Sequence, residues 1–372
     1  MAFSLGDDDR KLIGEVRALA RSELRDVVGR GAAGSVDRLL VARLGEVGLL
    51  LRLFPGGRPA SALQLCLLRE ALASESPEAE TALALQGLGS YPILQSGSSE
   101  QVKRWIPPVA SGDAVAAFAL TEPDHGSDAG SLALRAEPDG AGWRLTGTKK
   151  WISNAPEADI NVVFVRTTEG AGPRGVSAFV VPGDARGLSG RSLSMLAPHA
   201  LGELEFDGVV VGRANLLGEV DGGFRVAMRT LDLFRPSVGA FAVGMGQAAL
   251  EASLEHAGKR HAFGRPIKDF QAVSHSLAEM ATRTQAARLM VYAAADAYDS
   301  GAEDVSRTSA MAKLFATETA QWVVDSAVQI HGAAALEKGH RLEHLYREVR
   351  APRIYEGTSE IQREVIARSL FG

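Results

Sequence analysis

The stretch that decides the fold is Ala119-Leu-Thr-Glu-Pro-Asp-His-Gly-Ser-Asp128, which comes directly after a short β-type run. Its residues are loop formers with hydroxyls and backbone N–H groups that no ladder pairs. Such a loop suits hydrogen bonding to a polar heterocycle or to a phosphate. Taken alone, these residues usually form a plain turn, so a binding role needs support from the surrounding sequence.

Around this loop, short β-type runs separated by glycine and proline fill the middle of the chain. Alternation over four to eight residues between turn signals indicates half-buried strands. Many short strands in about 100 residues predict a small barrel or sandwich. The runs are Ala114–Leu120, Trp143–Thr146, Ile160–Val165, Ser177–Val181, Leu204–Phe206 and Val209–Val211.

Helical periodicity occupies the chain on both sides of this β region. Before it, apolar residues recur at helix spacing from about residue 8 to 110; after it come longer segments, at 224–258, 270–299, 304–332, 340–349 and 358–369. Glycine and alanine between 239 and 249 would let helices approach closely. We therefore predict an α+β fold with an N-terminal all-helical domain (1–113), a middle β-domain (114–218) and a C-terminal helical bundle (219–372).

Composition narrows the function. The 372 residues are 46% hydrophobic and carry a net charge of −5 without long blocks of one sign, which gives no support to nucleic-acid binding. The single cysteine, Cys66, excludes an intrachain disulfide framework and a cysteine-based zinc cluster. An acidic start and the lack of a run of about 20 apolar residues argue against a signal peptide and a membrane span. We expect a soluble, cytoplasmic protein without a metal site.

Two further motifs have residues suited to a cofactor. In Gly147-Thr-Lys-Lys-Trp-Ile-Ser-Asn154, the Trp and the Ser are two apart, so on a regular strand they would share one face. That pairing suits a stacked ring, although a core Trp would look the same. The basic segment Lys259–Gln271 separates two long helices and could hold a phosphate through Arg260, or it could be a solvated linker.

A fourth motif, Ile354-Tyr-Glu-Gly-Thr-Ser-Glu-Ile-Gln362, precedes the last helix. Thr358 is a plausible N-cap, and Ile361 would lie on the apolar face of that helix. A carboxylate such as Glu356 in an apolar setting can act as a general base with a raised pKa. Most glutamates are simply exposed, so this motif alone does not establish a catalytic role.

Together, in this order and across a helical, β and helical plan, the four motifs make the chain resemble the acyl-CoA dehydrogenase family of flavoproteins. The resemblance runs from Leu88-Gly-Ser-Tyr-Pro92 through Gln329-Ile-His-Gly332 to the end. It implies a C-terminal four-helix bundle, FAD between the β-domain and that bundle, and a homotetramer built as a dimer of dimers. It also implies an acyl-CoA substrate and an electron-transfer flavoprotein as the electron acceptor.

The resemblance also assigns residues that bind the cofactor. Leu120, Thr121, Ser127, Trp151 and Ser153 would surround the flavin ring. The other matches reach the FAD phosphates and adenosine, in part from a neighbouring subunit, or lie beside Glu356. They are Arg260, Phe263, Gln271, Gln329, Ala333, Thr358 and Glu360.

Glu356 matches the catalytic base of the straight-chain members of the family. It would remove the α-proton of an acyl thioester while the flavin takes the β-hydride, giving a trans-2-enoyl thioester. The resemblance implies that the Glu356 backbone N–H and a flavin hydroxyl polarise the thioester oxygen. The position of an alternative base holds Phe234. The residues expected to contact substrate are Ser127, Asp232, Arg235, Tyr355 and Gly357.

Three departures weaken the expectation about substrate: His125 in the first motif, Ala333-Ala-Ala335 in place of glycines, and the unusual segment Leu196–Leu204. A specialised acyl-CoA, or an acyl group on a carrier protein, is therefore an alternative. Two other readings stay open. One is an oxidase or monooxygenase that uses O₂ on the same fold. The other is a flavin-free or DNA-associated scaffold, against which the negative net charge argues.

Overall fold

A computed structural model describes residues 5–32 and 34–371 of the chain. They form two compact units, each made of segments distant in sequence. One unit holds the chain up to Ser22, residues 61–80 and everything from Asp232 onward; we call it the bundle unit. The other holds residues 23–60 and 81–231, and we call it the sheet unit. The predicted order of helical, β and helical segments is confirmed.

The sheet unit is built on a seven-stranded mixed sheet with the order β1-β4-β2-β3-β7-β6, in which β5 pairs with β4. Strands β4 and β5 are buried and lie antiparallel, and β1 runs parallel to β4. The sequence missed β2 and β6, because their mostly exposed residues show no apolar alternation. The strands are β1 Ala116–Ala119, β2 Arg135–Asp139, β3 Gly142–Ser153, β4 Ile160–Arg166, β5 Val176–Pro182, β6 Leu188–Leu193 and β7 Leu201–Val211.

Helices pack around this sheet within the same unit. Helix α2 (Arg38–Glu46) packs closely on α5 (Ser99–Ser111), since a Cβ on Gly45 would lie 1.9 Å from the Ser111 carbonyl oxygen. Two prolines lie inside the last turn of α5, which ends at Gly112 in the left-handed conformation (φ 83°). Helix α4 (Pro77–Ser96) begins with a proline at its first position, where no N–H is needed.

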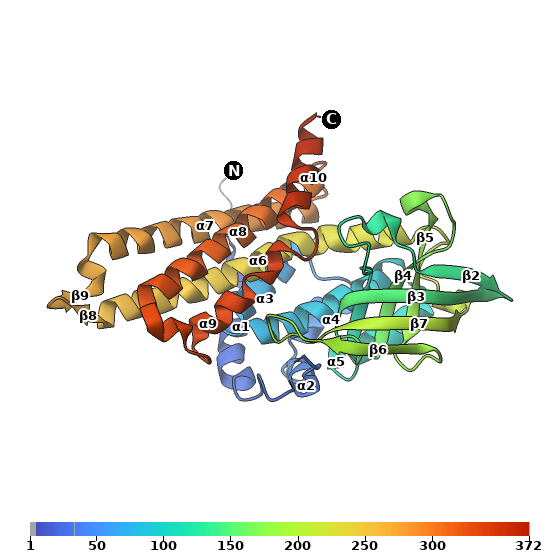
Figure 1. Ribbon diagram of the computed structural model, residues 1–372, viewed down its shortest axis with the longest axis horizontal. Helices are drawn as coiled ribbons and strands as arrows, with labels where there is room; N and C mark the ends of the chain where they lie inside the picture. The colour runs from blue at the N-terminus through green and yellow to red at the C-terminus, as the bar shows by residue number, and fades with distance from the viewer. Residues whose placement is uncertain (1–4, 33, 372) are drawn as a thin grey trace. The chain divides into compact units, whose positions relative to one another are not determined.

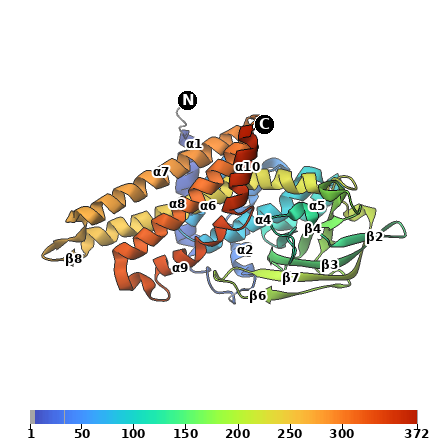
Figure 2. The same cartoon turned by 45° about the horizontal axis from the view of Figure 1, so that its top comes forward.

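Three long helices dominate the bundle unit, with α7 and α8 side by side (Figures 1 and 2). They are α6 (Gly223–Lys259), which belongs to this unit from Asp232 onward, α7 (Gln271–Asp299) and α8 (Val305–His331). The predicted close approach is confirmed at two glycines of α6. A Cβ on Gly239 would lie 2.7 Å from the Val291 side chain of α7, and one on Gly244 would lie 2.5 Å from the Glu70 carbonyl oxygen of α3 (Ala62–Ala73). Larger residues there would force the helices apart.

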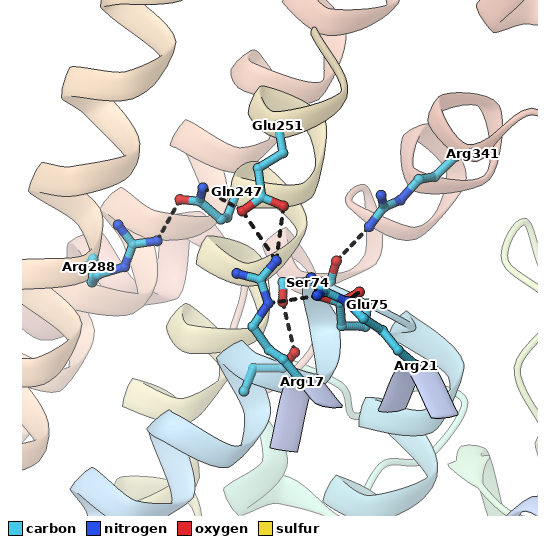
Figure 3. Close-up of polar contacts among 9 residues, drawn as sticks. Arg17, Arg21, Ser74, Glu75, Gln247, Glu251, Arg288 and Arg341 are labelled. Carbon is cyan, nitrogen blue, oxygen red and sulfur yellow. Dashed lines mark hydrogen bonds and ion pairs between the residues drawn. The ribbon is translucent and has the colours of Figure 1, made fainter. Parts of the chain in front are cut away.

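Helix α1 (Asp7–Leu19) is fastened to the bundle unit by a network of charged side chains (Figure 3). The Arg17 guanidinium donates to Glu75 at 2.7 Å and to Glu251 at 3.0 Å. Gln247 connects Glu251 to Arg288, at 3.0 and 2.8 Å. The Glu75 side chain is only 13% exposed, so its ion pair with Arg17 is worth more than a fully exposed one, whereas the Glu251 side chain is 37% exposed.

Short elements complete the bundle unit. Strands β8 (His261–Ala262) and β9 (Arg265–Pro266) form a hairpin between α6 and α7, and helices α9 (Arg341–Glu348) and α10 (Ser359–Phe371) follow α8. In the described part of the chain, no helix has both the length and the apolar character needed to span a membrane.

Candidate active site

The loop before α10 holds its main chain in an uncommon conformation. Glu356 and Gly357 both have positive φ, 53° and 91°. A left-handed glutamate is costly, so its neighbours must hold it. The Thr358 hydroxyl accepts a hydrogen bond from the Ile361 N–H at 3.3 Å, as predicted for an N-cap. The loop therefore presents Glu356 from a strained turn fixed to the first turn of a helix.

The Glu356 carboxyl lies among buried groups. Its Oε2 is buried and has no hydrogen-bond partner among the described residues. Desolvation raises the pKa of this carboxyl, and the nearby cations Arg69, Lys313 and Arg235 oppose that rise. A buried carboxylate with a free oxygen and a raised pKa has the properties of a general base.

The neighbouring cations are held by their own partners. The Arg69 guanidinium, buried on α3, pairs with the fully buried Glu80 and donates to the Ser237 hydroxyl at 2.7 Å. Arg235 donates from Nη1 to Asp232 at 2.8 Å, one turn apart on α6, while its buried Nε has no partner among the described residues. Burial raises the pKa of Asp232. The predicted Asp232–Arg235 pair thus lies beside Glu356, with one N–H available for a ligand.

Two side chains, Lys313 and Gln362, donate hydrogen bonds to the backbone of the turn at Glu356 and Gly357. The Lys313 ammonium, buried on α8, donates to the Gly357 carbonyl oxygen at 2.6 Å. The Gln362 amide donates to the same oxygen at 2.9 Å and to the Glu356 carbonyl oxygen at 3.2 Å. Neither residue was predicted from the sequence. A lysine at a position that falls on the buried stripe of α8, with Ala310 and Thr317, was the signal available for Lys313.

In the sheet unit, the first motif forms a loop anchored at both ends by one buried ion pair. The Glu122 carboxylate accepts hydrogen bonds from the Ala133 and Leu134 N–H groups at 2.6 and 2.9 Å. The Lys149 ammonium, fully buried on β3, reaches Glu122 and the Leu120 carbonyl oxygen, both at 2.8 Å. The loop is thus a built structure and more than a plain turn.

The residues of this loop differ in their exposure to solvent. Ser127 is exposed and Thr121 is half-buried, whereas Leu120 is buried. His125 was expected to crowd the loop; it is half-buried in a turn closed by reciprocal backbone hydrogen bonds with Glu122 at 3.3 Å. The loop therefore accommodates the larger residue.

The Trp–Ser pair of the second motif needs a correction. Trp151 has a positive φ of 56°, and the β3–β7 register shifts between Lys150 and Ile152. The pleat is therefore interrupted by a bulge, and the argument from regular alternation does not apply to Trp151 and Ser153. The bulge leaves the Trp151 side chain 43% exposed, as an aromatic plane that can stack on a ligand.

The third motif forms a tight hairpin. Phe263 and Gly264, the two residues at its tip, have φ of 51° and 81°, as type I′ hairpin turns require. Phe263 is 96% exposed, and Arg260 and Gln271 at the base of the hairpin are exposed as well. A strained and exposed phenylalanine is costly in an isolated chain, which points to a binding role.

The predicted residues of the bundle unit fall into two groups. His256 stacks on His331 with ring centroids 4.2 Å apart, which brings the end of α6 and its hairpin next to the end of α8, where Gln329 and Ala333 are exposed. Sixteen residues of α8 separate Gln329 from Lys313, which contacts Gly357 beside Glu356, so the groups are about 24 Å apart along the helix. Glu360 is exposed on α10 beside Thr358. One compact ligand cannot contact both groups; an extended dinucleotide or two subunits can.

Comparisons with known proteins identify the family of the chain. Three family models match the chain: the acyl-CoA dehydrogenase N-terminal domain at residues 6–113, the middle domain at 117–209 and the C-terminal domain at 221–371. An acyl-CoA dehydrogenase of Bacillus subtilis (strain 168) is 39% identical over 341 residues, which cover 90% of this chain and 89% of that protein.

Solved structures of related proteins share the fold of this chain. Butyryl-CoA dehydrogenase from Megasphaera elsdenii has a TM-score of 0.93 and 31% identity, covering 100% of both chains. PigA with FAD and proline has a TM-score of 0.93 and 29% identity, covering 100% of this chain and 99% of the other. The chain belongs to the acyl-CoA dehydrogenase family, whose members are FAD-dependent oxidoreductases that dehydrogenate a CH–CH bond of an acyl-CoA.

Proposed function

We propose that this enzyme oxidises an acyl-CoA thioester to the trans-2-enoyl thioester, with Glu356 as the base that takes the α-proton. The observation that carries the proposal is the buried Glu356 Oε2, which has no partner among the described residues and lies in a group of three cations. An α-proton of a thioester is weakly acidic, so a desolvated carboxylate of raised pKa is a suitable acceptor. The neutral acid formed by the transfer is favoured by the same burial.

Other residues of the chain would orient the thioester. Tyr355 and Gly357 flank the base and would contact the thioester. Asp232 fixes Arg235 through Nη1, and the buried Arg235 Nε, which has no partner among the described residues, would donate to the substrate. The Glu356 backbone N–H is our candidate donor to the thioester oxygen, where negative charge develops as the α-proton leaves. The base and the polarising donor would then come from one residue, held in place by the strained turn.

The sheet unit offers residues that fit FAD. The anchored loop supplies Leu120, Thr121 and Ser127, and the bulge of β3 supplies the exposed Trp151 together with Ser153. We propose that these five hold the flavin ring and that Thr358 and Glu360 contact the cofactor beside Glu356. FAD, when bound, supplies the acceptor for the β-hydride.

Anaerobic mixing with a panel of acyl-CoAs tests this function. We expect the FAD-loaded enzyme to lose its visible flavin absorbance with at least one straight-chain acyl-CoA, because the electron pair from the substrate reduces the cofactor. An electron-transfer flavoprotein, our proposed acceptor, should then restore the absorbance. Rapid formation of peroxide under air without that acceptor would favour the oxidase or monooxygenase instead. Loss of flavin absorbance only with acyl groups on an acyl carrier protein would show that the substrate is carried by that protein and not by CoA.

The hairpin supports a further part of the proposal, a homotetramer in which Arg260, Phe263 and Gln271 bind the FAD of a neighbouring subunit while Gln329 and Ala333 contact its adenine end. Phe263 is 96% exposed and strained within its own chain, which supports a contact with a neighbouring subunit. We expect Phe263→Ala to weaken FAD binding about ten-fold, equivalent to roughly 1.4 kcal/mol, the size of one aromatic contact. Fluorescence titration of FAD into the apoprotein measures this, and sedimentation reports the assembly.

Leu39→Ala is the matched control, because Leu39 on α2 is also a largely exposed apolar side chain, at 64%. It should leave FAD affinity unchanged. Equal affinity for FAD in the wild type and in Phe263→Ala would contradict the role of the hairpin.

A further inference from the structure

The Gly357 carbonyl oxygen receives two side-chain donors. Lys313 Nζ lies 2.6 Å from it and Gln362 Nε2 lies 2.9 Å from it. The same Gln362 amide also donates to the Glu356 carbonyl oxygen. Two successive residues with positive φ are therefore fixed through their carbonyl groups. Without these donors the left-handed Glu356 would relax toward the conformations that a glutamate prefers.

Using a buried lysine as the donor to the Gly357 carbonyl oxygen carries a large desolvation cost. Lys313 has no exposed surface, and burying an ammonium costs far more than burying an amide. The cost is visible in its pKa, which desolvation lowers to about 8. Gln362 already supplies a neutral donor to the same oxygen, so hydrogen bonding alone does not account for a charged residue here. Among the charges that act on Lys313, that of Glu356 is the strongest.

The charged groups around Glu356 differ in one respect. Arg69 pairs with Glu80, and Arg235 pairs with Asp232, so each has a carboxylate of its own. The hydrogen bond of Lys313 goes to a backbone carbonyl, and no carboxylate among residues 5–32 and 34–371 forms a direct ion pair with its ammonium. The titratable and charged groups whose charges act on Glu356 or Lys313, with the neighbouring Tyr355, come from α3, α4, α6, α8, α10 and the loop itself. They are Arg69, Glu80, Arg235, Lys313, Glu318, Tyr355 and Glu360.

We propose that Lys313 is a positioning residue for the base: its Nζ holds the Gly357 carbonyl, which fixes the strained Glu356, and its charge favours the ionised carboxylate. This inference rests on the proposed role of Glu356. It predicts that Lys313 acts on where the base sits and on the pH range in which the base works, while Gln362 acts on position alone. Both residues donate to the Gly357 carbonyl oxygen, and only Lys313 is charged. Replacing each in turn therefore separates the effect of the Lys313 charge from the effect of losing a donor to that oxygen.

The test follows α-proton exchange in a 3-thiaacyl-CoA bound to the FAD-loaded enzyme in D₂O. Sulfur at the β-position leaves no β-hydrogen to transfer, so exchange at the α-carbon, followed by NMR, reports the base alone. Lys313→Met and Lys313→Gln both remove the charge. Gln keeps the site polar and serves as the test variant if the Met variant does not fold. Gln362→Met removes the neutral donor. Lys11→Met removes a lysine that is 76% exposed on α1 and serves as the charge control.

We expect the wild-type exchange rate to rise with pH as Glu356 loses its proton. Without the Lys313 charge, the rising limb of this pH profile should shift to higher pH by about one unit. At a pH on the acid side of the limb, exchange then becomes roughly ten-fold slower. Well above pH 8, where Glu356 is ionised in every variant, the loss of charge should no longer matter. Lys313→Met should then keep only the pH-independent slowing that follows from losing its bond to the Gly357 carbonyl oxygen. Gln362→Met should slow exchange at every pH without moving the limb, and Lys11→Met should match the wild type.

Two results would count against the inference in distinguishable ways. A Lys313→Met or Lys313→Gln profile that superimposes on the wild-type limb overturns the role of Lys313 and leaves Glu356 as the base. A wild-type enzyme that binds the thioester but exchanges no α-proton removes Glu356 as the base, and the inference with it.

Discussion

Replacing Glu356 by Gln should lower the rate of flavin reduction by acyl-CoA about 10²- to 10⁴-fold, the range that a positioned general base contributes. Glutamine has nearly the same shape and cannot take a proton. Stopped-flow absorbance under anaerobic conditions measures the rate. The acid limb of the wild-type pH profile, where activity rises as the raised-pKa carboxyl ionises, should also be absent from this variant.

The variant should keep its FAD. We assign the flavin ring to residues of the sheet unit, and a glutamine leaves the turn and its donors Lys313 and Gln362 in place. Glu364→Gln is the matched control, because Glu364 is an exposed glutamate of α10 whose contact is an ion pair with Arg368 at 2.8 Å. It should reduce flavin at the wild-type rate. Normal reduction by Glu356→Gln would show that another group takes the α-proton.

Periodicity predicted the long helices well. The segments 224–258, 270–299 and 304–332 correspond to α6, α7 and α8 within a residue or two at each end, because apolar and small residues recur at helix spacing along them. Strand β6 was not predicted, because its residues are largely exposed and show no alternation of apolar and polar side chains. Strand β3 was predicted only to Thr146 and continues to Ser153, past Gly147 and through the bulge at Trp151.

For the candidate site, the motifs located the loops but not what holds them. Glu356 and the Asp232–Arg235 pair could be proposed through the resemblance to the family, because each falls in a short segment that matches the family's sequence. Arg69, Glu80 and Lys313 could not, because each lies in an apolar helix far away in sequence and only the packing of α3, α4 and α8 brings their charges near Glu356. The positive φ of Glu356 had no sequence signal either, since glycine follows it rather than replaces it.

Lys149 gives the other large expected effect. Lys149→Met should destabilise the protein by about 3–5 kcal/mol, because it leaves the buried Glu122 carboxylate without a counter-ion and the Leu120 carbonyl oxygen without its donor. The loop that we assign to the flavin ring is anchored by these two groups. FAD affinity should therefore fall more than ten-fold even where the variant is folded. Chemical unfolding of the apoprotein and fluorescence titration with FAD measure the two effects separately.

The adjacent lysine provides the matched control. Lys150 is half-buried and lies 3.4 Å from Glu203 across the β3–β7 pair, so Lys150→Met should cost less than about 1 kcal/mol. The double variant Glu122→Gln/Lys149→Met removes both buried charges and should recover part of the lost stability, since an amide still accepts from the Ala133 N–H. If Lys149→Met and Lys150→Met were equally stable and bound FAD equally well, the buried pair would not be what anchors the loop. The loop would then depend on its backbone turns alone, and Ser127 and Thr121 would keep their positions without Glu122.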